Sequence, residues 1–451
     1  MSMFWRMQHC RGFCFAVSRI KYFLSVRGFY GPVMSCYSST SSEQNSKNRD
    51  ICTSIMKHLL TKIKATGPIT VAEYMREVLT NPVMGYYVGK NMLGTEGDFV
   101  TSPEISQVFG ELVGVWCISE WMSAGKPKDF QIVELGPGRG SLMSDVLRVF
   151  SQLNSILTKS QISVHLVEVS PKLAEIQAEN LTVEKTGRIL DENAYKQGFT
   201  QTGLSICWYR SLQDVPRGCA FYLANEFFDA LPIHKFQKTE QGWREILVDV
   251  NPQLSNELRF VLAPFATLSS ETLIKTGEER MHVEVSPDAG LIIETVTDRI
   301  SSHGGALLVA DYGHDGIKGD TFRGFRGHKL HDVLKEPGTA DLTADVDFSY
   351  LQSVTAGKVK CLGPITQQEF LRNMCIDVRL QVLLNNANNP STYQQLINAY
   401  DMLMNPEKMG ERFKFFAMVP HSRLAAPEKN HKKLKPMSPP VAGFSVIEMG
   451  R

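Results

Sequence analysis

Five short apolar segments, separated by longer mixed stretches, set the strongest limit on how this chain can fold. They are FQIVEL (130–135), ISVHLVEV (162–169), LSICWYRS (204–211), CAFYLANEFF (219–228) and GALLVADYG (305–313). Strands that are apolar along nearly their whole length are buried on both faces, and the spacing between them leaves room for crossover helices. We therefore predict an α/β fold with a doubly wound, mostly parallel sheet.

The first 42 residues differ in composition from the rest. They hold five basic residues and no acid, and they end in the serine-rich segment SCYSSTSS. Such a start is typical of a mitochondrial transit peptide, so we predict import into the mitochondrial matrix. A disordered basic tail is the alternative interpretation.

Charge and cysteine usage exclude several classes of protein. Residues 43–451 carry 43 basic and 47 acidic side chains, so they lack the basic excess of a nucleic-acid-binding surface. Their six cysteines form no C-x-x-C pair and lie near no histidine cluster, so neither disulfides nor a metal site are predicted. No apolar run reaches the roughly 18 to 20 residues of a membrane-spanning helix.

Changes of pattern divide the chain into six regions. The helical pattern from Ile51, the N-cap signal Thr70-x-x-Glu73 and the helical pattern 107–122 mark the second of these. The hairpin-like alternation after Pro232 is far longer than an ordinary strand connection, which predicts an inserted substrate lobe. The regions are a transit peptide (1–42), an N-terminal helical and lid region (43–125), a first core part (126–231), the inserted lobe (232–303), a second core part (304–420) and a basic, proline-rich tail (421–451).

A glycine-rich turn follows the first core strand. Glu134 precedes Gly136, Gly138 and Gly140, and a helical pattern begins at Ser141. Glycines let a ligand approach the backbone closely, and the next helix offers unpaired N–H groups. The spacing G-x-G-x-G is not the dinucleotide fingerprint, and Glu134 would repel a pyrophosphate. A cationic adenosyl sulfonium fits this turn better.

Acids end two further core strands. Glu168 ends the second strand, where its carboxylate can accept hydrogen bonds from both hydroxyls of a ribose. Asn225, Glu226 and Asp229 end the fourth strand, at the edge from which catalytic groups face a ligand. We predict that Glu226 and Asp229 bind a guanidinium, whose planar donor fork matches carboxylates. Alternatively, Asn225 and Asp229 cap the turn that follows.

Six segments resemble the MidA-like family of class I S-adenosylmethionine-dependent methyltransferases. The resemblance covers residues 51–420 and implies a Rossmann-like fold with a seven-stranded sheet and S-adenosyl-L-methionine as cofactor. The segments are GPITVAEYM (67–75), GDFVTSPEIS (97–106), ELGPGRG (134–140), NEFFDALP (225–232), PGTADLTADVDF (337–348) and GERFKFFAM (410–418).

The resemblance also implies a function. Mitochondrial members look like protein arginine methyltransferases that form symmetric dimethylarginine on a subunit of respiratory complex I and act in its assembly. The substrate would then be a protein. The family's cofactor residues correspond to Glu134, Gly136, Gly138, Gly140 and Glu168, and those closing over cofactor or substrate to Asp98, Thr101, Ser102 and Glu104.

Methyl transfer needs mainly alignment of the accepting nitrogen with the methyl carbon. An arginine stays protonated in proteins, so a carboxylate must orient it and accept a proton as the new bond forms. Glu226 is our first candidate for this role, with Asp229 or Asp347 second. Two alternatives stay open, namely a methyltransferase for nucleic-acid amino groups and an assembly chaperone that keeps the fold without turnover. The sequence leaves the oligomeric state open.

Overall fold

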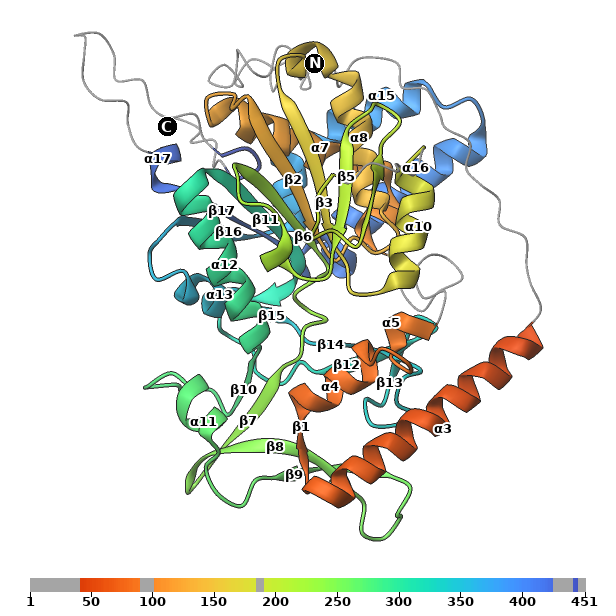
Figure 1. Ribbon diagram of the computed structural model, residues 1–451, viewed down its shortest axis with the longest axis vertical. Coiled ribbons are helices and arrows are strands. Elements are labelled where there is room, and N and C mark those ends of the chain that lie inside the picture. Colours follow the sequence, from red (N-terminus) through yellow and green to blue (C-terminus); the bar gives the residue numbers. More distant parts are fainter. Residues whose placement is uncertain (1–40, 90–100, 184–189, 425–440, 445–451) are drawn as a thin grey trace.

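The computed structural model describes residues 41–89, 101–183, 190–424 and 441–444, and its centre is a nine-stranded sheet (Figure 1). The strand order is β16-β17-β11-β6-β2-β3-β5-β4, and β15 pairs with β11. The strands are β2 (Asp129–Leu135), β3 (Gln161–Val167), β4 (Lys196–Phe199), β5 (Ser205–Tyr209), β6 (Ala220–Asn225), β11 (Gly305–His314), β15 (Val346–Asp347), β16 (Lys360–Thr366) and β17 (Phe413–Val419).

The five apolar segments form the parallel centre of this sheet, as predicted. β5, β3, β2, β6 and β11 are parallel neighbours, whereas β4 and β17 run antiparallel to β5 and β11. The chain proceeds from β2 to β3 and β5 on one side and then returns to β6 and β11 on the other. The carboxyl ends of β2 and β6 therefore flank the point where the strand order reverses, the usual ligand crevice of open α/β sheets.

The expected number of seven strands was wrong, because this sheet has nine. The shortest members are β4, with the sequence KQGF, and β15, with the sequence VD. Neither has an apolar run, so hydrophobic pattern gives no signal for them. Backbone pairing with β5 and β11 makes them strands.

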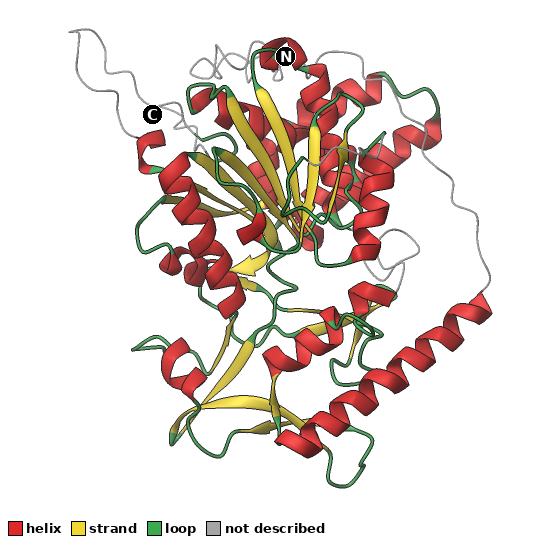
Figure 2. Cartoon of the chain, viewed as in Figure 1, coloured by secondary structure: helices red, strands yellow, loops and turns green. Residues whose placement is uncertain are grey.

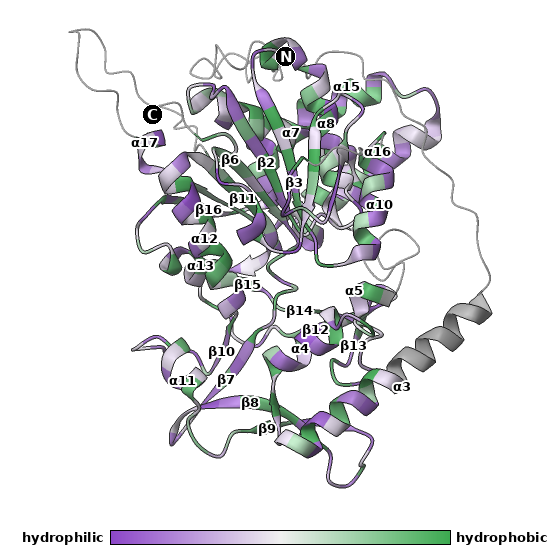
Figure 3. Ribbon diagram, in the orientation of Figure 1, coloured by the Kyte–Doolittle hydropathy of each residue, from purple (hydrophilic) through white to green (hydrophobic). Residues whose placement is uncertain are grey.

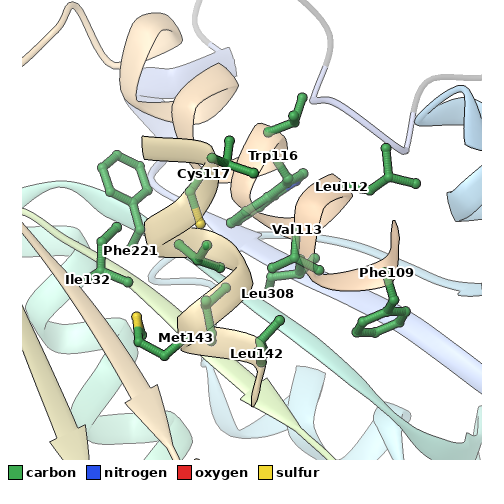
Figure 4. Packing of buried hydrophobic residues seen from close by; sticks show 14 of the residues in the cluster. Phe109, Leu112, Val113, Trp116, Cys117, Ile132, Leu142, Met143, Phe221 and Leu308 are labelled. Carbon is green, nitrogen blue, oxygen red and sulfur yellow. The ribbon is translucent and has the colours of Figure 1, made fainter. Parts of the chain in front are cut away.

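Helices cover both faces of the sheet (Figure 2). Along β2, Ile132 packs in the cluster on one face and Val133 in the cluster on the other, as the alternation of strand side chains requires. Figure 4 shows part of the first cluster, to which α7 contributes Phe109 and Trp116 and β2 contributes Ile132. The first face is covered by α7 (Gln107–Ser123), α8 (Ser141–Gln152), α10 (Pro171–Leu181), α14 (Gln367–Asn373), α15 (Ile376–Asn385) and α16 (Pro390–Met404), and the second by α12 (Pro287–His303) and α13 (Phe348–Val354).

A second body lies beyond the carboxyl ends of the central strands (Figure 1). Its five-stranded antiparallel sheet joins strands of the insertion to β1 from the N-terminal region, which pairs with β8. Green, hydrophobic residues follow the strands of the main sheet, whereas β7 is mostly purple (Figure 3). The sheet contains β1 (Ile69–Thr70), β7 (His234–Thr239), β8 (Gly242–Val250), β9 (Leu258–Leu262) and β10 (His282–Val285).

Three segments that are distant in sequence build this lobe. Helices α3 (Ser41–Thr66) and α4 (Val71–Thr80) pack on it, and Thr70 caps α4 by accepting the Glu73 N–H at 3.1 Å, as predicted. A three-stranded sheet from the second core part adds Leu342 and Ala344 to the same hydrophobic cluster. Its strands are β12 (Arg323–Arg326), β13 (Lys329–His331) and β14 (Asp341–Thr343).

Two of the predicted regions lie mostly outside the residues that the structure describes. Residues 1–40 of the predicted transit peptide lie outside the described residues, as does most of the tail. Within the described ranges, no helix has the length and apolarity needed to cross a membrane, and no three His, Cys, Asp or Glu side chains gather as metal ligands.

Helix α7 is buried on nearly all sides, and two of its buried residues are Glu111 and Glu120. A buried carboxylate needs a positively charged partner. Arg379 binds Glu111 through Nε at 2.7 Å and Nη2 at 3.1 Å, and Arg423 binds Glu120 through Nε at 2.9 Å and Nη2 at 3.1 Å. All four side chains are at most 4% exposed. These forked pairs fix α15 and the short helix α17 (His421–Leu424) to α7.

We expect Arg379→Met to lower the free energy of unfolding by about 3 to 5 kcal/mol, because it leaves Glu111 buried without its main partner. The double variant Glu111→Leu with Arg379→Met removes both charges and should recover much of that loss. Urea unfolding of the chain from residue 43 measures both. Equal losses in the single and double variants would contradict a charge-burial origin.

Candidate active site

The glycine turn joins β2 to α8, and its backbone dihedral angles are ones that residues with a Cβ atom rarely adopt. Gly136, Gly138 and Gly140 have φ values of 63°, 55° and 82°, all in the left-handed region. A Cβ atom on Gly136 would lie 2.7 Å from the ring of Phe227, so that position also lacks space. The turn thus keeps its backbone close to the end of β6, beside the acids described next.

Two buried carboxyls flank this turn on the neighbouring strands β2 and β3. Glu134 is 2% exposed, and burial, with the nearby Glu168 charge, raises its pKa to about 8. Glu168 is 6% exposed, and burial raises its pKa to about 7. Glu134 Oε2 has no hydrogen-bond partner in the part of the chain that the structure describes. A buried acid of this kind is stabilised by a cationic ligand.

Glu168 is held by its own surroundings. The Ser170 N–H donates to Oε1 at 2.7 Å, and Gln177 Nε2 donates to Oε2 at 3.0 Å. Each oxygen therefore accepts one hydrogen bond within the protein and keeps capacity for another. That arrangement suits the two hydroxyls of a ribose. Sequence reasoning found Glu168 but missed Gln177, whose position inside a helical pattern carries no motif.

The NEFFD segment leaves β6 in a tight turn built around one carboxylate. Asp311 Oδ2 accepts the N–H groups of Phe227 at 3.1 Å, Phe228 at 2.9 Å and Asp229 at 3.4 Å. The turn begins at Glu226, whose φ of 49° is unusual for a non-glycine residue. Asp311, fully buried on β11, was also missed, although an acid inside the apolar run GALLVADYG is itself a signal.

Glu226 meets Ser102 and Asn225 at the carboxyl edge of the sheet. Its Oε1 accepts the Ser102 N–H at 2.8 Å and Asn225 Nδ2 at 3.3 Å, and burial raises its pKa to about 8. Three acceptor atoms here, Glu226 Oε2, Asn225 Oδ1 and Ser102 Oγ, lack hydrogen-bond partners among the described residues. Because buried polar atoms are normally paired, these three mark a place for a ligand.

A local capping box positions Ser102, which belongs to the predicted lid segment. Thr101 is the N-cap of the short helix α6 (Ser102–Ile105), and the Thr101 N–H donates to Glu104 Oε2 at 3.2 Å. This capping box fixes the backbone that presents the Ser102 N–H to Glu226. Asp98, predicted in the same segment, lies outside the described residues.

The two other predicted acids have partners within the protein. Asp229 is buried, accepts Thr343 Oγ1 at 2.7 Å, and its pKa is raised to about 6 by burial. This contact ties it to β14, whereas the alternative interpretation had it capping the turn. Asp347 accepts the Tyr350 N–H at 3.1 Å as the N-cap of α13, and it pairs with Arg280 at 3.0 Å.

Comparison with known proteins assigns the chain to a family of enzymes. A family model described as S-adenosyl-L-methionine-dependent methyltransferase matches residues 112–365. The chain belongs to this methyltransferase family. The human mitochondrial protein arginine methyltransferase NDUFAF7 is 62% identical over 412 residues, which cover 90% of this chain and 93% of that protein. Its homologue in Drosophila melanogaster is 46% identical, with 89% and 91% covered.

A solved structure shares the fold of this methyltransferase. It is a Burkholderia thailandensis protein bound to S-adenosyl-homocysteine, with a TM-score of 0.68, 24% sequence identity, and coverage of 85% of this chain and 95% of that one. The predicted family, the methyltransferase class of the enzyme and its cofactor, S-adenosyl-L-methionine, are thereby confirmed.

The residues of the methyltransferase fit its cofactor. The glycines of the turn put no side chain in the way of a ligand, the unpaired Glu134 oxygen suits a positive charge, and Glu168 suits a ribose. The cofactor carries both features and, when bound, supplies an electrophilic methyl group on a sulfonium. We expect Glu134 and Glu168 to hold it.

The raised pKa of Glu134 predicts a conflict between stability and binding. A carboxyl whose pKa rises from 4.5 to about 8 on folding keeps its proton in the folded state, so stability falls as pH rises between these values. Glu134→Gln removes this loss. We expect its gain in unfolding free energy over wild type to grow by about 2 kcal/mol from pH 6 to pH 8, without cofactor.

The same variant should bind S-adenosylmethionine at least about 10-fold more weakly, because a glutamine cannot ionise when the sulfonium binds. Urea unfolding and calorimetric titration supply the two measurements. Glu179→Gln, which changes an exposed glutamate of α10, is the matched control and should alter neither. A stability gain independent of pH would show that Glu134 ionises normally in the folded protein.

Proposed function

We propose that this methyltransferase transfers methyl groups to an arginine side chain of a respiratory complex I subunit, forming symmetric dimethylarginine, in the mitochondrial matrix. Two facts support an arginine substrate. The relatives that cover nine tenths of the chain carry the name protein arginine methyltransferase, mitochondrial. The site at the end of β6 offers acceptor atoms and acids, the groups that a guanidinium requires.

One observation carries the proposal. Glu226 Oε2, Asn225 Oδ1 and Ser102 Oγ are buried acceptors without hydrogen-bond partners in the described ranges, and their residues contact one another through Glu226 Oε1. A guanidinium presents five N–H donors and no acceptor, so it can donate to the carboxylate, amide and hydroxyl oxygens of this set, and the Ser102 hydroxyl then directs its own hydrogen to another acceptor. A neutral amine or hydroxyl substrate would satisfy fewer of these atoms.

Glu226 is the proposed catalytic residue. A guanidinium at this site favours the ionised carboxylate, which lowers the pKa of Glu226 from the value near 8 that burial gives it. With the cofactor bound, the carboxylate would orient one nitrogen toward the methyl group and accept its proton as the nitrogen–carbon bond forms and the carbon–sulfur bond breaks, which leaves a neutral thioether. The Ser102 N–H and Asn225 Nδ2 fix Oε1, so Oε2 is the oxygen that meets the substrate.

The other acids are proposed to support Glu226. Asp229 anchors the turn after β6 through Thr343, and Asp347 binds the N-terminus of α13 and Arg280. Both acids would thereby hold the backbone around the site in place and contribute to its electrostatic potential. Asp98, Thr101 and Glu104 belong to the proposed lid. Supporting this role, the capping box of Thr101 and Glu104 positions the Ser102 backbone.

The division of the chain is also part of the proposal. Residues 1–42 would direct import, 43–125 and 232–303 would receive the protein substrate, 126–231 and 304–420 would form the catalytic core, and 421–451 a tail. In support, β1 of the N-terminal region pairs with β8 of the insertion, so both contribute to the lobe beyond the carboxyl edge of the main sheet (Figure 1).

We expect Glu226→Gln to lower kcat for arginine methylation by about 100-fold or more, since general-base catalysis contributes that much. Binding of S-adenosylmethionine should change less than about threefold, because the hydrogen bonds of Glu226 go to Ser102 and Asn225. Mass spectrometry of complex I subunits incubated with enzyme and cofactor reports the product, and calorimetry reports binding.

Glu294→Gln, at an exposed position of α12, is the matched control and should keep wild-type turnover. Wild-type turnover by Glu226→Gln would remove Glu226 from the mechanism. Cofactor binding by wild type without methylation of any subunit would favour a scaffold on a methyltransferase fold.

A further inference from the structure

Gln177 lies where the glycine turn, the end of β3 and strand β5 meet. It belongs to α10 and has no exposed surface. Its Nε2 donates to Gly138 O at 2.7 Å and to Glu168 Oε2 at 3.0 Å, while Trp208 Nε1 donates to its Oε1 at 2.9 Å. One side-chain amide thus connects three elements of the cofactor site.

Trp208 fixes which way this amide faces. An indole nitrogen can only donate a hydrogen bond, so the atom of Gln177 opposite it must be the oxygen. The NH2 group therefore faces the carbonyl of Gly138 and the carboxylate of Glu168, and each of its hydrogens has an acceptor. The nitrogen and oxygen of a side-chain amide are nearly identical in size, so their positions are assigned from their hydrogen-bond partners. Here the partners allow one assignment.

The contact also acts on the ionisation of Glu168, whose pKa burial raises to about 7. An NH2 donor at Oε2 and the Ser170 N–H at Oε1 both favour the carboxylate form, against the burial that favours the protonated acid. Both oxygens then act as acceptors, as a ribose diol needs. The hydrogen bond to Gly138 O also holds the backbone of the turn. Gln177 therefore fixes the distance between the glycine turn and the Glu168 carboxyl.

We propose that Gln177 is a positioning residue for the cofactor, whose amide joins the glycine turn to Glu168 and presents that acid to the ribose hydroxyls. The role depends on cofactor binding, which the family establishes, and is independent of the arginine substrate. A residue needed only for packing would be apolar, because burying an amide costs free energy unless every polar atom is paired. Here the pairing is complete and directed at the site.

The test is calorimetric titration of the chain from residue 43 with S-adenosylhomocysteine and with its 2′-deoxyadenosyl analogue. Wild type should bind the ribose form at least about 10-fold more tightly, because the deoxy form leaves a Glu168 acceptor unused. Gln177→Met keeps the side-chain volume and removes the donors. It should bind S-adenosylhomocysteine at least about 10-fold more weakly and discriminate between the two ligands less than about threefold.

Steady-state kinetics separates positioning from folding. For Gln177→Met we expect KM for S-adenosylmethionine to rise at least about 10-fold, with kcat at saturation within about twofold and KM for the protein substrate unchanged. Trp208→Phe removes the donor that orients the amide, so it should give a smaller effect of the same kind.

Two variants serve as controls. Gln381→Met changes an exposed glutamine of α15, and Val149→Ala opens a cavity in the buried face of α8; neither should alter ribose discrimination. Discrimination at the wild-type level in Gln177→Met, or an equal loss in Val149→Ala, would overturn the role of Gln177. Failure of wild type to bind S-adenosylhomocysteine would overturn the cofactor site as well.

Discussion

The site depends on the carboxylate of Asp311, which accepts three successive backbone N–H groups from the segment after β6. Backbone groups in a tight turn need such an acceptor when water is excluded. The contact holds Glu226 in a left-handed conformation that a non-glycine residue adopts at a cost. The proposed catalytic carboxylate is therefore positioned from the neighbouring strand β11, and not by its own helix or loop.

Burial of carboxyls gives this enzyme both its binding groups and a source of instability. Burial raises the pKa values of Glu134 and Glu226 to about 8 and that of Glu168 to about 7, so the unliganded protein holds its acids closer to the neutral form than free carboxyls are. The carboxyls of α7, Glu111 and Glu120, differ in having forked arginine partners, although burial raises the pKa of Glu120 as well. The acids of the candidate site form no such forked pair among the described residues, and we propose that the cofactor and the substrate supply the opposite charge.

The lobe shows how tertiary pairing joins segments that sequence patterns keep apart. The insertion was predicted to stand beside the carboxyl edge, and its strands pair as hairpins there. Its sheet also takes β1 from the N-terminal region, and its hydrophobic cluster takes Leu342 from beyond β11. The last residues assigned to the insertion form helix α12, which was not predicted and which packs on the main sheet instead of joining the lobe. Apolar periodicity identifies a helix but not the surface that it will cover.

Local patterns pointed to many residues of the candidate site. The sequence pattern indicated the glycine turn, Glu134 and Glu168 at strand ends, and the NEFFD segment. Glycines or acids directly after a buried strand are typical of ligand sites, and the glycines do adopt left-handed φ values. Asp311, Gln177 and Thr343 were not assigned. Each acts through a partner 39 or more residues away, such as Gly138 for Gln177 and Asp229 for Thr343, and no local spacing encodes such a contact.

The sequence by itself therefore determined the class of fold, the order of its central strands along the chain, and the family to which the enzyme belongs. Hydrophobic periodicity and glycine placement depend on neighbouring residues, so they survive without a structure. Only the tertiary structure decided the nine-stranded sheet, the composite lobe and the partners that orient each acid. Those features depend on long-range hydrogen bonds and on burial, which exist only once distant segments have packed together.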